Sequence, residues 1–156
     1  MDGKLLNFDT ELFNQPVTVA IGDLDIALNF LREKMSAVSF EKTENHMRQC
    51  DGYALQADTG EGVHNFIWVN DFLNVDTLFH EALHTAFNIL DWVGVPADAD
   101  SQEAVAYLQS WLVKRIRTLY ESDETNAVSA DTAFDAKLST AAVDNYWGCR
   151  RAVGRK

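Results

Sequence analysis

Residues 80–84 read His-Glu-Ala-Leu-His, so two histidines stand four positions apart with a glutamate directly after the first. On a helix, side chains four positions apart point the same way, one turn apart. Two imidazoles placed in this way can share one tetrahedral zinc ion, at about 2.0–2.1 Å each. Glu81 is rotated by about 100° from His80, so it reaches a water on the ion and not the ion itself. The pattern predicts a zinc site formed by His80 and His84, with Glu81 as the general base.

The segment around this pattern has the periodicity of an amphipathic helix. Apolar side chains cover one continuous side of Val75–Trp92, and both histidines fall near the border of that side. No Gly or Pro interrupts the pattern, whereas Gly94 and Pro96 stop the helix after it. We therefore expect the two histidines to lie on a helix, at the floor of a cleft.

A zinc site of this kind needs a third protein ligand and a position for water. No histidine follows His84 in the chain. The remaining candidates are the carboxylates of Asp98, Asp100 and Glu103, which lie near the start of a second long helix expected over about 101–120. We favour Glu103, because the link between the helices is long enough to fold the second back on the first and bring its first turn over the histidines.

The same acidic residues also fit a structural role at the start of the second helix. In a capping box, Asp100 would cap the helix and Glu103 would reach back to the backbone N–H of Asp100. Glu103 also lies away from the apolar stripe of its helix. The sequence leaves three assignments open: Glu103 is the third ligand, Glu103 is part of a cap, or Asp98 or Asp100 is the ligand.

The rest of the chain predicts an α+β domain that surrounds this helix. Residues 17–21 alternate as in a strand, and 24–35 suit a helix. Residues 53–57 and Val63–Val69 predict two strands joined as a hairpin. We expect a single domain over 1–156, in which a small, mostly antiparallel sheet packs beside a helical layer that contains the HExxH helix.

Two segments have weaker patterns. Residues 41–51 are polar and do not predict a particular structure. In 121–156, apolar residues suggest at least one more helix that packs on the body: Phe134, Leu138, Tyr146 and Trp147.

The composition excludes several classes of partner. The formal net charge of −11 argues against binding to nucleic acid, because phosphates need clustered Lys and Arg. No apolar run approaches the roughly 18 residues that span a bilayer. The first residues lack the basic flank and apolar stretch of a signal peptide. We therefore expect a cytoplasmic protein that binds neither nucleic acid nor membrane. Its expected partner is a peptide or protein substrate.

The HExxH pattern of residues 80–84, with Glu103 on the helix expected after it, resembles that of the gluzincins. These are zinc metallopeptidases that carry HExxH on one helix and a glutamate on the next. The resemblance covers about 63–120. It implies that His80, His84 and Glu103 bind zinc and that Glu81 is the base. It also implies that Val63–Val69 forms the upper rim of the cleft and pairs with extended substrate. The chain looks most like the minimal single-domain versions, including small HExxH proteins encoded by phages and mobile elements.

Peptide hydrolysis would also require a second donor to the oxyanion. Tyr107, His64, Tyr120 and Tyr146 are candidates, and the sequence does not choose among them. The alternative function is a non-catalytic zinc-binding structural or interaction protein of a larger assembly, such as a phage assembly, which the small size and the strong acidity also fit. A third is a regulatory protease-like domain that cleaves one partner.

The HExxH pattern predicts that protein purified without added metal carries about one zinc ion per chain. Zinc affinity should fall below about pH 6, because protonated imidazoles do not bind metal. Elemental analysis of the wild type beside His80→Ala and His84→Ala tests this directly. Zinc uptake that is unaffected by both substitutions would contradict the assignment.

Overall fold

The computed structural model describes residues 3–58, 62–96 and 98–122. Within these residues the chain forms strands and helices in the following order: β1 (Lys4–Asp9), β2 (Pro16–Ile21), α1 (Leu24–Lys34), α2 (Ala37–Met47), β3 (Gly52–Asp58), β4 (Val63–Val69), α3 (Val75–Trp92) and α4 (Gln102–Ser122). The further helix expected around Phe134, Leu138, Tyr146 and Trp147 lies outside the described residues.

The strands form one mixed sheet with the order β1-β2-β4-β3. β1 and β2 pair antiparallel, as do β3 and β4, whereas β2 and β4 are parallel. The predicted α+β class with a mostly antiparallel sheet is therefore confirmed. The expectation that β4 is the rim strand is wrong, because β2 and β3 occupy both of its hydrogen-bonding sides. The strands at the two edges of this sheet are β1 and β3.

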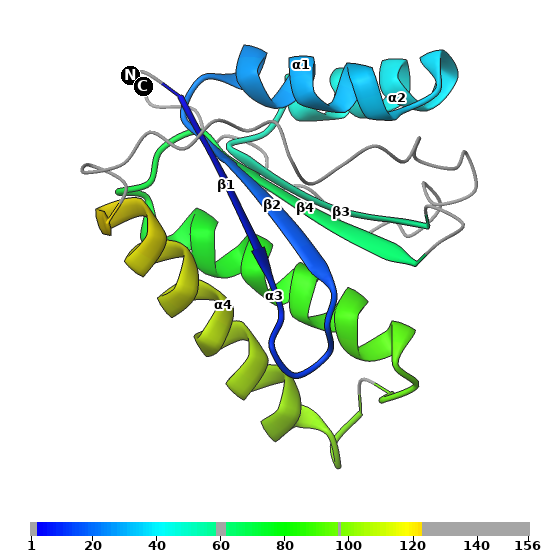
Figure 1. Ribbon diagram of the computed structural model, residues 1–156, viewed down its shortest axis with the longest axis vertical. Helices are drawn as coiled ribbons and strands as arrows, with labels where there is room; N and C mark the ends of the chain where they lie inside the picture. Colours follow the sequence, from blue (N-terminus) through cyan, green and yellow to red (C-terminus); the bar gives the residue numbers. More distant parts are fainter. Residues whose placement is uncertain (1–2, 59–61, 97, 123–156) are drawn as a thin grey trace.

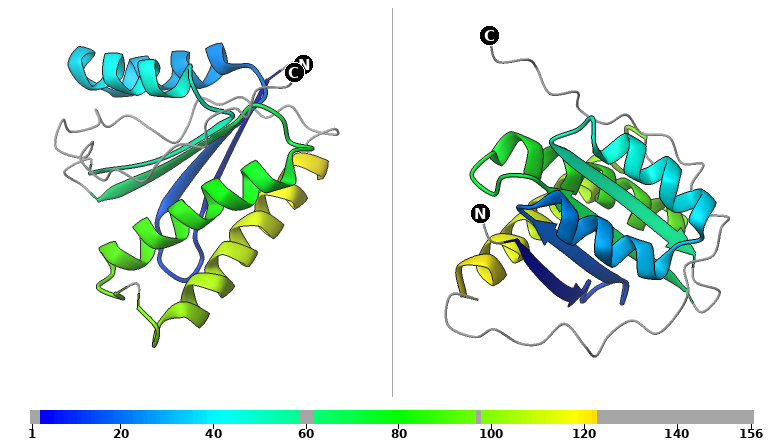
Figure 2. Two further views of the ribbon diagram at one scale, coloured as in Figure 1. Left: turned by 180° about the vertical axis from the view of Figure 1, so that it is seen from behind. Right: turned by 90° about the horizontal axis from the view of Figure 1, so that it is seen from above.

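Helices cover both faces of the sheet (Figures 1 and 2). α1 and α2 lie on one face, and α3 and α4 lie side by side on the other. The sequence predicted a single helical layer, and the structure adds the second. No helix in the described part of the chain is both long and apolar enough to cross a membrane.

Each face of the sheet has its own apolar core, because neighbouring side chains of a strand point to opposite faces. Along β4, Ile67 and Val69 contribute to the core below α3 and α4, and Phe66 and Trp68 to the core below α1 and α2. Along β2, Val19 contributes to the core between the sheet and α3 and α4, and Ala20 to the core between the sheet and α1 and α2. This two-sided burial explains why β4 is apolar throughout and buried at every position.

Two elements were not predicted from the sequence, β1 and α2. In β1, only Leu6 and Phe8 are buried, so its apolar alternation is too short to stand out. In α2, the polar run hides a helix whose start is capped by Ser36, which accepts a hydrogen bond from the backbone N–H of Ser39. Packing on the rest of the protein stabilises both elements more than their own sequence patterns do.

His64 lies on the face of the sheet below α1 and α2. Its Nε2 is 2.9 Å from Oγ1 of Thr18, and that hydroxyl donates to Oδ1 of Asn7 at 2.7 Å. The Thr18 oxygen therefore accepts from Nε2–H of His64. Burial, and then the charge of Lys34, lower the pKa of His64 to about 4. His64 is consequently neutral in the folded protein at neutral pH.

The lowered pKa of His64 predicts a loss of stability in mild acid. The unfolded chain takes up a proton near pH 6.5 and the folded chain only near pH 4, so unfolding binds a proton between these values. The free energy of unfolding should therefore fall as the pH is lowered through this window, by up to about 3 kcal/mol in total. Urea unfolding as a function of pH measures this fall.

His64→Gln should reduce the pH dependence between these values, and His84, whose pKa is also lowered, contributes to the part that remains. His46 is exposed on α2, so His46→Gln is the matched control and should leave the dependence unchanged. Equal pH profiles for the wild type and His64→Gln would contradict the assignment to His64.

Candidate metal centre

The helix that carries the motif spans Val75–Trp92, as the sequence predicted. It begins at Asn74, whose side chain accepts a hydrogen bond from the backbone N–H of Thr77 at 3.2 Å. It ends before Gly94, which adopts a φ of 78° that favours glycine. The caps therefore fix a helix of five turns in which His80 and His84 lie one turn apart near the middle.

The two imidazoles face one another. Their Nε2 atoms are 3.0 Å apart, and their ring centroids are 4.5 Å apart with the planes at 86°. Two ligand nitrogens at about 2.05 Å from one tetrahedral zinc ion lie about 3.3 Å apart. The observed separation differs from this value by a few tenths of an ångström. The two nitrogens thus fit a shared zinc ion after a small rotation of either ring.

The electrostatic surroundings of His84 favour the form that binds metal. Burial, and then the neighbouring His80, lower the pKa of His84 below its usual value. The imidazole is therefore neutral at neutral pH, as a metal ligand must be. Nδ1 of His84 is also buried, and within the described residues it has no hydrogen-bond partner.

Glu81 lies on another side of the helix from the histidines, as its position in the motif requires. Its side chain is only 2 % exposed and packs below the first residue of the edge strand β3. A β-carbon added to Gly52 would be 2.8 Å from Cγ of Glu81 and 3.0 Å from its Oε1. The carboxylate is therefore packed against the first residue of β3.

The start of α4 settles one of the open assignments. Oδ1 of Asp98 accepts hydrogen bonds from the backbone N–H groups of Asp100, at 2.9 Å, and Ser101, at 3.1 Å. The predicted capping box is therefore wrong, because the N–H that Glu103 was to bind is bonded to Asp98. The Asp98 side chain instead closes the turn that precedes α4.

α4 runs antiparallel to α3, and one hydrogen bond defines their register. Nε2 of Gln109 donates to the carbonyl oxygen of Phe79 at 2.8 Å. From this point, Glu103 is six residues back along α4, or about 9 Å, and His84 is five residues forward along α3, or about 7.5 Å. The backbones of Glu103 and His84 therefore lie at nearly the same level along the helix pair.

The Glu103 side chain itself does not form a cluster with the two histidines. It is exposed in the first turn of α4. In residues 3–58, 62–96 and 98–122, no three side chains of His, Cys, Asp or Glu lie close enough together to hold a metal ion. The structure brings His80 and His84 together with Glu81 on the same helix, and the assignment of Glu103 as third ligand stays a prediction.

The residues suggested as oxyanion donors lie elsewhere in the fold. His64 is on the opposite face of the sheet from α3. Tyr120 stacks on Phe72 with the ring centroids 3.8 Å apart, near the start of α3. Tyr107 is 74 % exposed and lines a pocket against the β1–β2 turn. Tyr146 is outside the described residues. None of the three described candidates belongs to the histidine site.

Sequence reasoning did not find Gly52, which sets the position of Glu81. The signal available was a glycine at the start of a strand, which often marks a close approach of another element. That signal does not say which element approaches. Only the packing of α3 on β3 shows that Glu81 and Thr77 fill the space where a β-carbon of Gly52 would lie.

No protein-family model, curated protein or solved structure matches this chain. The geometry of the site therefore supplies the argument for function. That geometry is a pair of imidazoles whose Nε2 atoms are at hydrogen-bond distance, and a buried glutamate that follows the first histidine and packs against the first residue of β3.

The packing at Gly52 predicts that Gly52→Ala destabilises the protein and displaces Glu81. The new β-carbon would be 2.5 Å from Cγ2 of Thr77 and 2.8 Å from Cγ of Glu81. An overpacked core of this kind costs about 1–3 kcal/mol, measured by urea unfolding. Adding Thr77→Ser removes the methyl group in the closer contact and should restore part of the loss. Unchanged stability in Gly52→Ala would show that the helix and strand are not in this contact.

Proposed function

We propose that this protein is a zinc-dependent peptidase in which His80, His84 and Glu103 bind the ion and Glu81 is the general base. The observation that carries the proposal is the 3.0 Å separation of the two Nε2 atoms on one helix, which fits two ligands of a single zinc ion. Glu81 follows the first ligand by one residue, the arrangement that a base for a zinc-activated water needs.

Three observations support Glu103 as the third ligand. Its backbone is level with His84 in the helix pair, to within about 1.5 Å. The backbone N–H of Asp100 is bonded to Asp98, which leaves the Glu103 carboxylate without the role it would have in a capping box. The carboxylate is exposed, so a change of side-chain rotamer moves it without disturbing a core.

When bound, the ion would polarise the scissile carbonyl and lower the pKa of the attacking water. Glu81 would take a proton from that water and pass it to the leaving amine. Packing against Gly52 and Thr77 limits the rotamers of Glu81. The carboxylate is thus held in one orientation before substrate arrives, which reduces the entropy lost in reaching the transition state.

The substrate class follows from the sheet edge above Glu81. β3 is the last strand on its side of the sheet, and its first residue contacts Glu81. An extended peptide can bind such an edge by main-chain hydrogen bonds, as an added strand. A peptide that binds along β3 would lie beside the strand whose first residue packs on Glu81. An extended segment of a peptide or protein is therefore the proposed substrate.

The second candidate function is a zinc-binding structural or interaction protein without turnover. The observation that favours it is the burial of Glu81, which is only 2 % exposed. A general base must reach water, and a deeply packed glutamate on the motif helix could have a structural role alone. The two functions predict different effects of Glu81→Gln on peptide cleavage.

For the peptidase, Glu81→Gln should retain zinc and reduce cleavage by at least about 10²-fold, because the amide cannot accept the proton. Cleavage can be followed by mass spectrometry of a mixed peptide library, and zinc by elemental analysis. Glu33 is exposed on α1, so Glu33→Gln is the matched control. Zinc-loaded wild type that cleaves nothing in the library would favour the structural function. Loss of zinc from folded Glu81→Gln would mean that Glu81 is a ligand.

Glu103→Ala should weaken zinc binding about as much as His84→Ala, because each removes one of three protein ligands. Glu121 is exposed on the same helix, and Glu121→Ala should leave zinc binding unchanged. Competition with a chromogenic chelator measures the affinities. Equal zinc affinity in Glu103→Ala and the wild type would remove Glu103 from the site and leave His80 and His84 in place.

A further inference from the structure

An apolar pocket of about 390 Å³ lies on the side of α4 that faces the β1–β2 turn. Its walls come from residues 10–13 of the turn, from Leu90 at the end of α3, and from α4. Tyr107, Leu108 and Trp111 form most of the α4 wall. Neither His80 nor His84 belongs to this lining. The pocket is therefore separate from the candidate metal centre.

Two strongly exposed apolar side chains flank the pocket. Leu12 is 84 % exposed and Tyr107 is 74 % exposed. Both line the pocket, from opposite walls. Contiguous apolar surface of this kind on a protein marks an interaction site more often than isolated exposed residues do. Aromatic side chains around a pocket are also the usual anchors of protein interfaces.

The turn that presents Leu12 is held by hydrogen bonds. The backbone N–H groups of Thr10 and Gln15 each donate within the turn, to the Gln15 carbonyl and to Oγ1 of Thr10, both at 2.9 Å. Asn14 adopts a φ of 49°, the left-handed region that asparagine tolerates best after glycine. Thr10 and Gln15 are also buried. The exposure of Leu12 is therefore built into an ordered turn, which reduces the entropic cost of binding.

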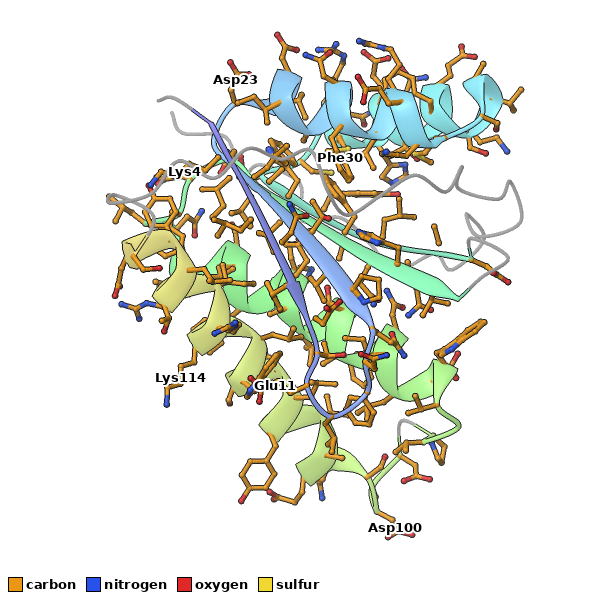
Figure 3. The ribbon with its side chains drawn as sticks, in the orientation of Figure 1. Lys4, Glu11, Asp23, Phe30, Asp100 and Lys114 are labelled. Atoms are coloured by element: carbon orange, nitrogen blue, oxygen red, sulfur yellow. The ribbon has the colours of Figure 1, made fainter. Side chains whose placement is uncertain are left out.

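The charged residue of the pocket lining is an acid, Glu11. Glu11 belongs to the lining and lies at the turn beside α4, whereas Lys114 points outward from α4, away from the turn (Figure 3). Asp9 is also exposed, just before the turn. A second copy of this chain would place acidic groups against acidic groups, which opposes association. A basic partner would find complementary charge.

We propose that this pocket docks a partner protein through a segment that inserts an apolar side chain flanked by lysine or arginine residues. The apolar side chain would lie between Leu12 and Tyr107, and the basic groups would lie near Glu11. The pocket volume is within the range of about 300–1,000 Å³ in which proteins bind compact apolar groups. The inference does not depend on the proposed peptidase activity.

Fluorescence anisotropy with three matched synthetic peptides tests the proposal on the full chain. The first is Lys-Lys-Ser-Leu-Trp-Ser-Lys-Lys, the second replaces Leu-Trp by Ser-Ser, and the third replaces each Lys by Glu. The first should bind at least about tenfold more tightly than either of the others, a difference of about 1.4 kcal/mol. Equal binding of the first and third, or no saturable binding of the first at millimolar concentration, would overturn the proposal.

Variants of the protein locate the binding. Leu12→Ser removes an exposed contact and Ala104→Trp fills the pocket, so each should weaken binding of the first peptide by at least about tenfold. Glu11→Lys should weaken it at low salt and less at high salt. Val38 is 69 % exposed on α2, and Val38→Ser is the matched control that should change nothing.

Binding of the first peptide that is unaffected by both Leu12→Ser and Ala104→Trp would show that it occupies another surface. Sedimentation velocity examines the other occupant of an apolar surface, a second copy of the chain. A dimer that Leu12→Ser abolishes would replace the basic partner by self-association and overturn the proposal. Wild type that stays monomeric over the concentrations used for anisotropy is the expected result.

Discussion

The contact between α3 and the first residue of β3 is the constraint on which the candidate site depends. It is close enough that the strand has room only for glycine, since a β-carbon at Gly52 would overlap Thr77 and Glu81. Because α3 is one rigid helix, fixing the side that bears Glu81 also fixes the direction of His80 and His84. The distance between the carboxylate and the sheet edge and the orientation of the imidazole pair are therefore set by the same packing.

That packing gives the site two different environments within one turn of helix. Glu81 is enclosed between helix and sheet, whereas His80 and His84 are only partly buried. The lowered pKa of His84 follows from this partial burial and from the second imidazole beside it. A neutral His84 imidazole and a carboxylate held near a strand edge are compatible in one site because they occupy different sides of the helix.

Local sequence patterns predicted the elements with strong periodicity. They failed where contacts between distant segments determine the structure. The bounds of α3 and β4 and the geometry of the histidine pair follow from local spacing, and they were predicted. The position of β4 in the centre of the sheet was not, because strand order depends on pairing with β2, which no local pattern specifies. The turn closed by Asp98 and the role of Gly52 were missed for a related reason. Residue type does not show which backbone N–H groups Asp98 binds, and Gly52 acts only through α3.

The parallel pairing of β2 and β4 also determines when the sheet can form during synthesis of the chain. Val17 is paired with Asn65, and α1, α2 and β3 all lie between the two strands in the sequence. Until β4 leaves the ribosome, β2 has only β1 as a neighbouring strand in the described sheet. At about 5–20 residues per second this interval lasts several seconds. During that time the β1–β2 hairpin exposes the strand edge that β4 later covers, and this edge is the surface of the nascent chain that most needs protection from aggregation.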